Sequence, residues 1–219
     1  MNSIWRNTTL LALSQGLMVS TISLIMTCSA LVGQALATDK SLSTLPVAVM
    51  FITTMLISMP ASFFMAKIGH KFGFMLASII GFLGGGLSTY AIIQQNFWLF
   101  VAGIGLIGLF NGFGNYFRFV AADSVEVSQK SKAISFVMVG GLAAAFIGPN
   151  LAHIAKNWIS NAEFAGSYAL TMLIYLLIFT TLGFLKLPKA EAEQKDKASA
   201  ARPLREIVKQ PLFIVAVLC

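Results

Sequence analysis

With 219 residues, of which 57% are hydrophobic and 11% charged, and a mean hydropathy of +0.82, this sequence is far more apolar than a water-soluble domain, in which about 25% of residues are charged. The net charge of +7 does not indicate nucleic-acid binding, because the basic residues occupy short gaps between apolar runs and form no stripe with interleaved aromatic residues. Composition therefore predicts an integral membrane protein whose first partner is the lipid bilayer, and it excludes a nucleic-acid-binding protein.

Long apolar runs follow one another along the chain. A hydrocarbon core of about 30 Å needs about 20 helical residues per crossing, so the sequence predicts an all-α membrane protein. The six predicted spans cover residues 8–36, 46–66, 72–93, 97–122, 133–155 and 166–185. Ala35-Leu36-Ala37 resembles a signal-peptidase site, but the first run is much longer than the about 7–15 apolar residues of a signal sequence. We therefore interpret it as a retained helix.

Lysine and arginine are unevenly distributed between the gaps. Lys40 and Lys156 fall on one side of the predicted membrane, the other basic residues outside the spans fall on the opposite side, and Arg118 lies within a span. Cytoplasmic loops carry the excess of Lys and Arg. We therefore expect a multi-pass cell-membrane protein, of the kind found in a bacterial inner membrane, with its N-terminus in the cytoplasm.

The composition changes after the sixth span. Residues 187–210 are rich in Ala, Glu, Lys and Gln, and they predict a cytoplasmic linker that follows a six-helix bundle over residues 1–186. Residues 211–219 are apolar again but too few to cross a bilayer. We interpret them as the start of a truncated seventh transmembrane helix.

Polar side chains recur at helical spacing within several spans. In lipid, such faces turn toward other helices or toward a water-filled cavity, and an arginine at the centre of a span costs about 2.5–3.5 kcal/mol to insert. The predicted substrate-cavity residues are Gln15, Ser20, Ser23, Thr27, Asn111, Asn115, Arg118 and Tyr175. Two alternatives stay open: hydroxyl groups that only join neighbouring helices, and an Arg118 side chain that extends to the membrane interface.

The sequence offers little for catalysis or metal binding. Cys28 and Cys219 lie in apolar segments and indicate neither a disulfide framework nor a metal site. His70 falls in a predicted loop and His153 near the end of the fifth span, and no acidic pair lies within a span. We therefore expect neither an intramembrane protease nor another enzyme, and no cofactor or metal.

Two short motifs carry a resemblance to a known family. The end of the second span and the gap after it read Ser62-Phe-Phe-Met-Ala-Lys-Ile-Gly-His-Lys71, and the fifth span contains Ala144-Ala-Phe-Ile-Gly148-Pro149. Proline lacks a backbone N–H and clashes with the preceding turn, so Gly148-Pro149 predicts a bend in the fifth span. Together with six spans and a charged linker, these motifs resemble the amino-terminal half of a major facilitator superfamily transporter.

The resemblance assigns roles to the matched positions. Lys67, Gly69 and Lys71 match the conformational-switch loop of the family, in which His70 stands in place of an arginine and Ala66 in place of an acid. Gly148 and Pro149 match the bend motif common in proton-coupled antiporters. The resemblance implies two inverted three-helix repeats in this half, and a substrate site shared with a second six-helix half that is missing here.

We therefore predict a secondary transporter that moves a small solute by alternating access, with proton coupling as one option. The alternative is a truncated half that does not transport by itself, or a scaffold that needs a partner half. The end of the chain within a seventh apolar segment motivates this alternative.

Overall fold

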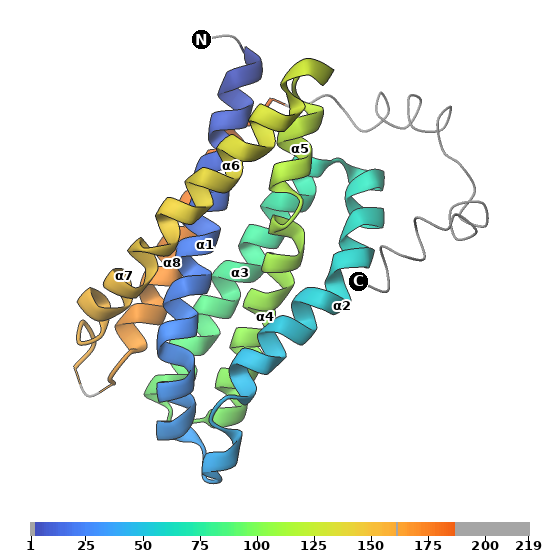
Figure 1. Cartoon of the computed structure of the whole chain (residues 1–219). Helices are drawn as coiled ribbons and strands as arrows, with labels where there is room; N and C mark the ends of the chain where they lie inside the picture. Colours follow the sequence, from blue (N-terminus) through green and yellow to red (C-terminus); the bar gives the residue numbers. More distant parts are fainter. Residues whose placement is uncertain (1–2, 161, 187–219) are drawn as a thin grey trace, which may run out of the picture. The chain divides into compact units, whose positions relative to one another are not determined.

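The computed structural model describes residues 3–160 and 162–186. Every regular element in these two ranges is helical (Figure 1). The elements are α1 (Ser3–Leu36), η1 (Lys40–Leu42), α2 (Leu45–Ile68), α3 (His70–Ile93), α4 (Phe97–Gly114), α5 (Phe117–Asp123), η2 (Val127–Gln129), α6 (Lys130–Ala145), α7 (Ile147–Ala155) and α8 (Ala165–Gly183). The predicted linker and the start of a seventh helix lie outside the described residues.

Within the described ranges, six helical segments are long and apolar enough to cross a membrane, which confirms the predicted number of spans and the all-α class. Three spans are single helices (α1, α3 and α8). The second consists of η1 and α2, the fourth of α4 and α5, and the fifth of η2, α6 and α7. The sequence predicted a bend in the fifth span but took the fourth as continuous. The structure corrects that second point, because the fourth span is interrupted at Asn115 and Tyr116.

Local sequence sets several helix ends. The Asn96 side chain accepts a hydrogen bond from the backbone N–H of Leu99 at 3.0 Å and so begins α4. Pro46 lies in the first turn of α2, where its missing N–H costs nothing. Gly69 separates α2 from α3 with a φ of 90°, a conformation in which glycine avoids the steric penalty of a Cβ atom.

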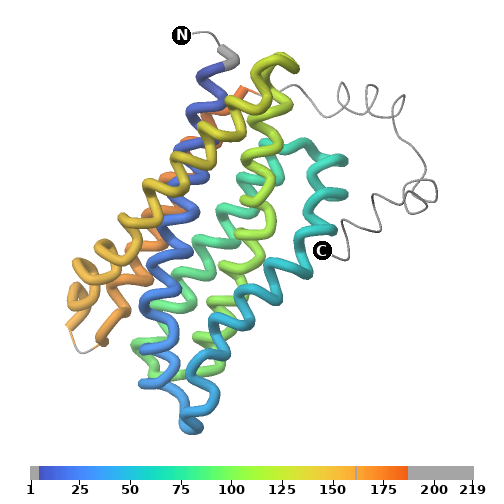
Figure 2. The backbone as a smooth tube through the Cα atoms, viewed as in Figure 1, coloured from blue at the N-terminus to red at the C-terminus, as the bar shows by residue number. Residues whose placement is uncertain are grey.

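The helices pair in a regular pattern. α1 packs on α6 and α7, α2 packs on α4, and α3 packs on α8. If spans one to three and spans four to six are equivalent triplets, span one corresponds to span four and span two corresponds to span five. The contact between spans one and five is then equivalent to the contact between spans four and two. This reciprocal pairing is the one expected for two three-helix repeats. Figures 1 and 2 show α6 and α7 running beside α1, while α2 leans away from α1 toward its C-terminal end.

The fourth span is the centre of the bundle. Within its most apolar window 72% of residues are buried, against 11% in the second span and 22% in the fifth. Aromatic pairs fix the centre: Phe110 lies 4.9 Å from Tyr175, and Phe100 lies 5.2 Å from Tyr168, measured between ring centroids. The second and fifth spans therefore present broad apolar faces that lipid or another protein segment must cover.

Candidate functional site

The seam between α1 and the fifth span is held by hydroxyl groups that bond to backbone carbonyls. Ser20 Oγ donates to the carbonyl oxygen of Ala144 at 2.9 Å, and Ser23 Oγ donates to that of Ala145 at 2.8 Å. Pro149 has no N–H to offer the carbonyl of Ala145 four residues earlier. The Ser23 hydroxyl supplies the missing donor, as an unsatisfied carbonyl within a membrane requires.

Proline also explains where the fifth span breaks. α6 ends at Ala145 and α7 begins at Ile147, so Phe146 is the junction. The break lies N-terminal to Pro149 because the proline ring disturbs the turn that precedes it. Gly148 lies against α1, where an added Cβ would overlap the carbonyl oxygen of Ser20. The bend motif therefore brings the fifth span into close backbone contact with α1.

The fourth span breaks between two polar side chains. Asn115 follows the last residue of α4, its backbone N–H still donates to Asn111, and α5 begins at Phe117. Glycine and asparagine are poor helix formers, and Gly112, Gly114 and Asn115 stand together at this point. The hydroxyl of Tyr116 donates to the carbonyl oxygen of Ser58 at 2.9 Å, which ties the break to α2. Sequence analysis did not single out Tyr116, although this cluster of weak helix formers beside it signals an interruption.

Four of the predicted cavity residues keep a buried polar atom without a hydrogen-bond partner among the described residues. These atoms are Gln15 Oε1 on α1, Asn111 Oδ1 on α4, Arg118 Nε on α5 and Tyr175 Oη on α8. Asn111 is 3% exposed, and the Arg118 guanidinium lies 5.0 Å from the ring centroid of Phe119. A buried polar group left unpaired costs about 1–3 kcal/mol, so each of these atoms requires water, a solute or a further protein group.

Tyr175 and the remaining cavity candidates have different surroundings. Thr27 is exposed and bonds to the carbonyl of Ser23 within its own helix at 2.8 Å. Asn115 is exposed at the end of α4. Tyr175 is fully buried on α8, where its ring packs on Phe110 and faces Gly81 of α3. The hydroxyl groups of Ser20 and Ser23 donate to backbone carbonyls of the fifth span. The assignment of these residues, and of the others with unpaired atoms, to a substrate cavity stays a prediction.

The loop between α2 and α3 connects to the end of the sixth span. Lys71 Nζ donates to the carbonyl oxygens of Gly183 at 2.6 Å and Leu185 at 2.9 Å. A cation at this place satisfies carbonyls that have no partner within α8 and opposes the negative end of its dipole. Lys67 is exposed in the last turn of α2, and the His70 ring lies 6.3 Å from that of Phe74. Their role in a conformational switch stays a prediction.

Sequence analysis also missed the contacts that join the two ends of the bundle. Asn7 Nδ2 donates to the carbonyl oxygen of Lys186 at 2.7 Å, and Ser14 shares a hydrogen bond with Thr181 at 3.1 Å. The first pair joins α1 to the segment that follows α8, and the second joins α1 to α8 itself, although these segments are far apart in the sequence. The sequence shows Asn7 and Ser14 as polar residues near or within an apolar run, which indicates that they need hydrogen-bond partners. Nothing in the sequence identifies Lys186 and Thr181 as those partners.

Membrane-length helices paired in this reciprocal way, with unsatisfied polar groups buried inside them, are those of a multi-pass membrane protein. The chain belongs to the major facilitator superfamily, whose family model matches residues 8–219. It is 34% identical over 212 residues to the riboflavin transporter RfnT of Brucella anthropi, an alignment that covers 97% of this chain and 53% of that protein. The chain thus spans about half the length of this curated relative. The superfamily is one of transporters and is not a class of enzymes.

Proposed function

We propose that this chain forms the amino-terminal six-helix half of a secondary transporter that moves a small solute by alternating access. The observation that carries the proposal is the set of unpaired atoms on the cavity candidates Gln15, Asn111, Arg118 and Tyr175, all inside membrane-length helices. A structural helix has no reason to keep such groups, because each one weakens the fold. A solute with complementary donors and acceptors would satisfy them during transport.

Riboflavin is the first solute to test, because the similar protein from Brucella anthropi is a riboflavin transporter. The ring system of riboflavin carries carbonyl acceptors and an imide N–H donor. The guanidinium of Arg118 donates hydrogen bonds, and the side-chain oxygens of Gln15 and Asn111 accept them, so the three groups offer both kinds of partner. Arg118 would also favour a solute with an anionic group.

We further propose that transport requires a second six-helix half. The chain corresponds to 53% of its relative, and the second and fifth spans are largely exposed within the described bundle. In a two-half transporter the solute lies between the halves near the middle of the membrane. One bundle alone has no second wall for such a site.

Uptake of labelled riboflavin into a bacterial strain without its own riboflavin uptake system tests this proposal. The chain is expressed alone and together with a second six-helix half of the same superfamily type, taken from the similar transporter. We expect uptake only when both halves are present, and its response to an imposed pH gradient will reveal proton coupling. Uptake by the chain alone would contradict the need for a second half. If the combined halves take up neither riboflavin nor any other small solute, the proposal of transport is contradicted.

A further inference from the structure

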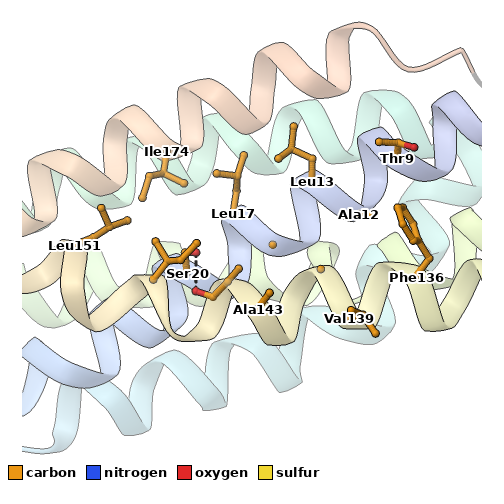
Figure 3. A pocket seen from close by; sticks show the side chains of 14 residues that line it. Thr9, Ala12, Leu13, Leu17, Ser20, Phe136, Val139, Ala143, Leu151 and Ile174 are labelled. Atoms are coloured by element: carbon orange, nitrogen blue, oxygen red, sulfur yellow. Dashed lines mark hydrogen bonds between the residues drawn. The ribbon is translucent and has the colours of Figure 1, made fainter.

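An apolar groove lies on one side of the bundle, between α1, α6, α7 and α8 (Figure 3). Its volume is about 510 Å³. Leu13 and Leu17 of α1, Val139 and Ala143 of α6 and Ile174 of α8 are among the residues that line it, and Figure 3 shows Leu13 and Leu17 extending from α1 toward α8. Ser20 also lines the groove, but its hydroxyl is bonded to the Ala144 carbonyl. The groove therefore offers hydrocarbon contact and little hydrogen bonding.

Three basic residues lie around one end of this groove. Arg6 precedes the lining residues Thr9 and Leu13 on the same face of α1, and Lys132 precedes the lining residue Phe136 by one turn of α6. Lys186 lies at the same end, because its backbone is hydrogen-bonded to Asn7. None of these three cations forms an ion pair with a carboxylate in the part of the chain that the structure describes.

Arg6 carries the clearest sign of a missing partner. Its Nε and Nη2 atoms are buried and have no hydrogen-bond partner among residues 3–160 and 162–186. A guanidinium group favours planar, bidentate contact with phosphate or carboxylate. Beside it, Trp5 stands edge-to-face with Phe136 at 6.4 Å, and tryptophan is enriched where a membrane meets water.

The length of the groove matches the depth of one lipid leaflet. At a rise of about 1.5 Å per residue, α1 extends about 17 Å between Thr9 and Ser20, both of which line the groove. One leaflet of a hydrocarbon core of about 30 Å is about 15 Å deep. An acyl chain that begins at the basic end would therefore fill the groove at the depth where lipid tails lie.

We propose that this groove binds an anionic phospholipid, with one acyl chain between α1, α6 and α8 and the phosphate held by Arg6 beside Lys132 and Lys186. Basic pockets between transmembrane helices recognise anionic head groups in this way. The proposal depends on membrane insertion and is independent of solute transport, so it stands or fails separately from the proposed function.

Native mass spectrometry of the full 219-residue chain, titrated with phosphatidylglycerol or phosphatidylcholine, tests the proposal. We expect one phosphatidylglycerol to bind at least about tenfold more tightly than phosphatidylcholine. The Arg6→Gln variant should lose about tenfold in affinity for phosphatidylglycerol, which corresponds to about 1.4 kcal/mol. Lys67→Gln removes the same charge from an exposed site on α2 that does not line the groove, and it should bind as the unmodified chain does.

A second pair of variants tests the acyl-chain contact. Ala143→Phe fills the groove, whereas Ala102→Phe places the same ring on an exposed position of α4 outside it. Only the first should weaken phosphatidylglycerol binding, and circular dichroism should show equal helicity for both. Equal binding of the two lipids, or equal affinity of the Arg6→Gln and unmodified chains, would overturn the proposal. So would a dimer that Ala143→Phe dissociates, because a second copy would then occupy the groove.

Discussion

Four predicted cavity residues, Gln15, Asn111, Arg118 and Tyr175, differ from the two serines Ser20 and Ser23 in one respect. Each has a buried polar atom without a partner among the described residues, whereas Ser20 and Ser23 donate to carbonyls of the fifth span. Hydrogen bonds between membrane helices contribute only about 0.6 kcal/mol on average, and an unpaired buried group costs about 1–3 kcal/mol. The two serine hydroxyls therefore join α1 to the fifth span, and the four residues with unpaired atoms are the first to test for contact with a solute.

At Arg118, replacement by alanine should reduce solute uptake by about tenfold or more in the assembled transporter, because a hydrogen bond to a charged group contributes about 1.5–3 kcal/mol. Initial uptake rates, normalised to the amount of protein in the membrane, measure the effect. Arg118→Lys should keep part of the activity, since it keeps the charge but loses the planar fork. Lys156→Ala removes a charge from the loop beyond α7 and serves as control. Unchanged uptake by Arg118→Ala would remove this residue from the mechanism.

At the level of secondary structure, the fifth span is shaped by its contact with α1. Phe146 separates α6 from α7, Gly148 lies against the backbone of α1, and Ser23 satisfies the carbonyl that Pro149 leaves free. The break of the fifth span, its close backbone contact with α1 and the hydroxyl that replaces the missing proline N–H therefore occur at one place. This arrangement makes the geometry of the fifth span dependent on α1.

Ser23 and Pro149 should be energetically coupled. Ser23→Ala leaves the Ala145 carbonyl without a donor and should destabilise the bundle by about 0.6 kcal/mol. In a Pro149→Ala background the restored N–H can bond to that carbonyl, so the same serine substitution should cost less. Unfolding in sodium dodecyl sulfate, followed by circular dichroism for both single variants and the double variant, measures the coupling. Equal costs in the two backgrounds would show that Ser23 does not replace the missing proline donor.

Gly148 should tolerate no larger side chain. Gly148→Leu would push α7 away from α1, because even a Cβ atom overlaps the Ser20 carbonyl oxygen, and overpacking of this kind typically costs about 1–3 kcal/mol. Gly183→Leu is the matched control, since a Cβ at Gly183 meets no atom within 4 Å. The midpoint of unfolding in sodium dodecyl sulfate should fall for the first variant only. A stable Gly148→Leu protein would contradict the close contact.

In the molecule as a whole, an even number of spans brings the start of α1 and the end of α8 together. The hydrogen bonds between Asn7 and Lys186 join these two ends, and Lys71 bonds to the carbonyls that follow α8. Lys67 lies in the last turn of α2, whereas Lys40 lies between α1 and α2, near the opposite end of α2. The basic residues cluster with the joined ends, which supports a cytoplasmic N-terminus.

Cysteine labelling in intact cells tests this orientation. In a background that carries Cys28→Ala and Cys219→Ser, a membrane-impermeant maleimide should label Lys40→Cys from outside. It should label Lys67→Cys only after the cells are permeabilised, because that position lies at the other end of the spans. The reverse pattern would place the N-terminus outside the cell and contradict the distribution of lysine and arginine.

Much of the fold could be predicted from the sequence. The number of spans follows from hydropathy, because the length needed to cross a bilayer is a property of each segment alone. The polar stripes follow from the helical period, since residues three or four positions apart share a face. Proline likewise marked the bend of the fifth span through its own covalent structure.

The partners of the polar residues depend on which helices lie side by side, and local patterns do not encode this. Ser20 and Ser23 bond to the fifth span because α6 ends opposite them. The Tyr175 ring is buried because it lies against Gly81 and Phe110. The break before Phe117 and the groove beside Leu13 arose in the same way, from contacts between residues far apart in the chain. Hydropathy and periodicity fixed the helices and their faces, while packing between helices determined which polar groups were left without partners.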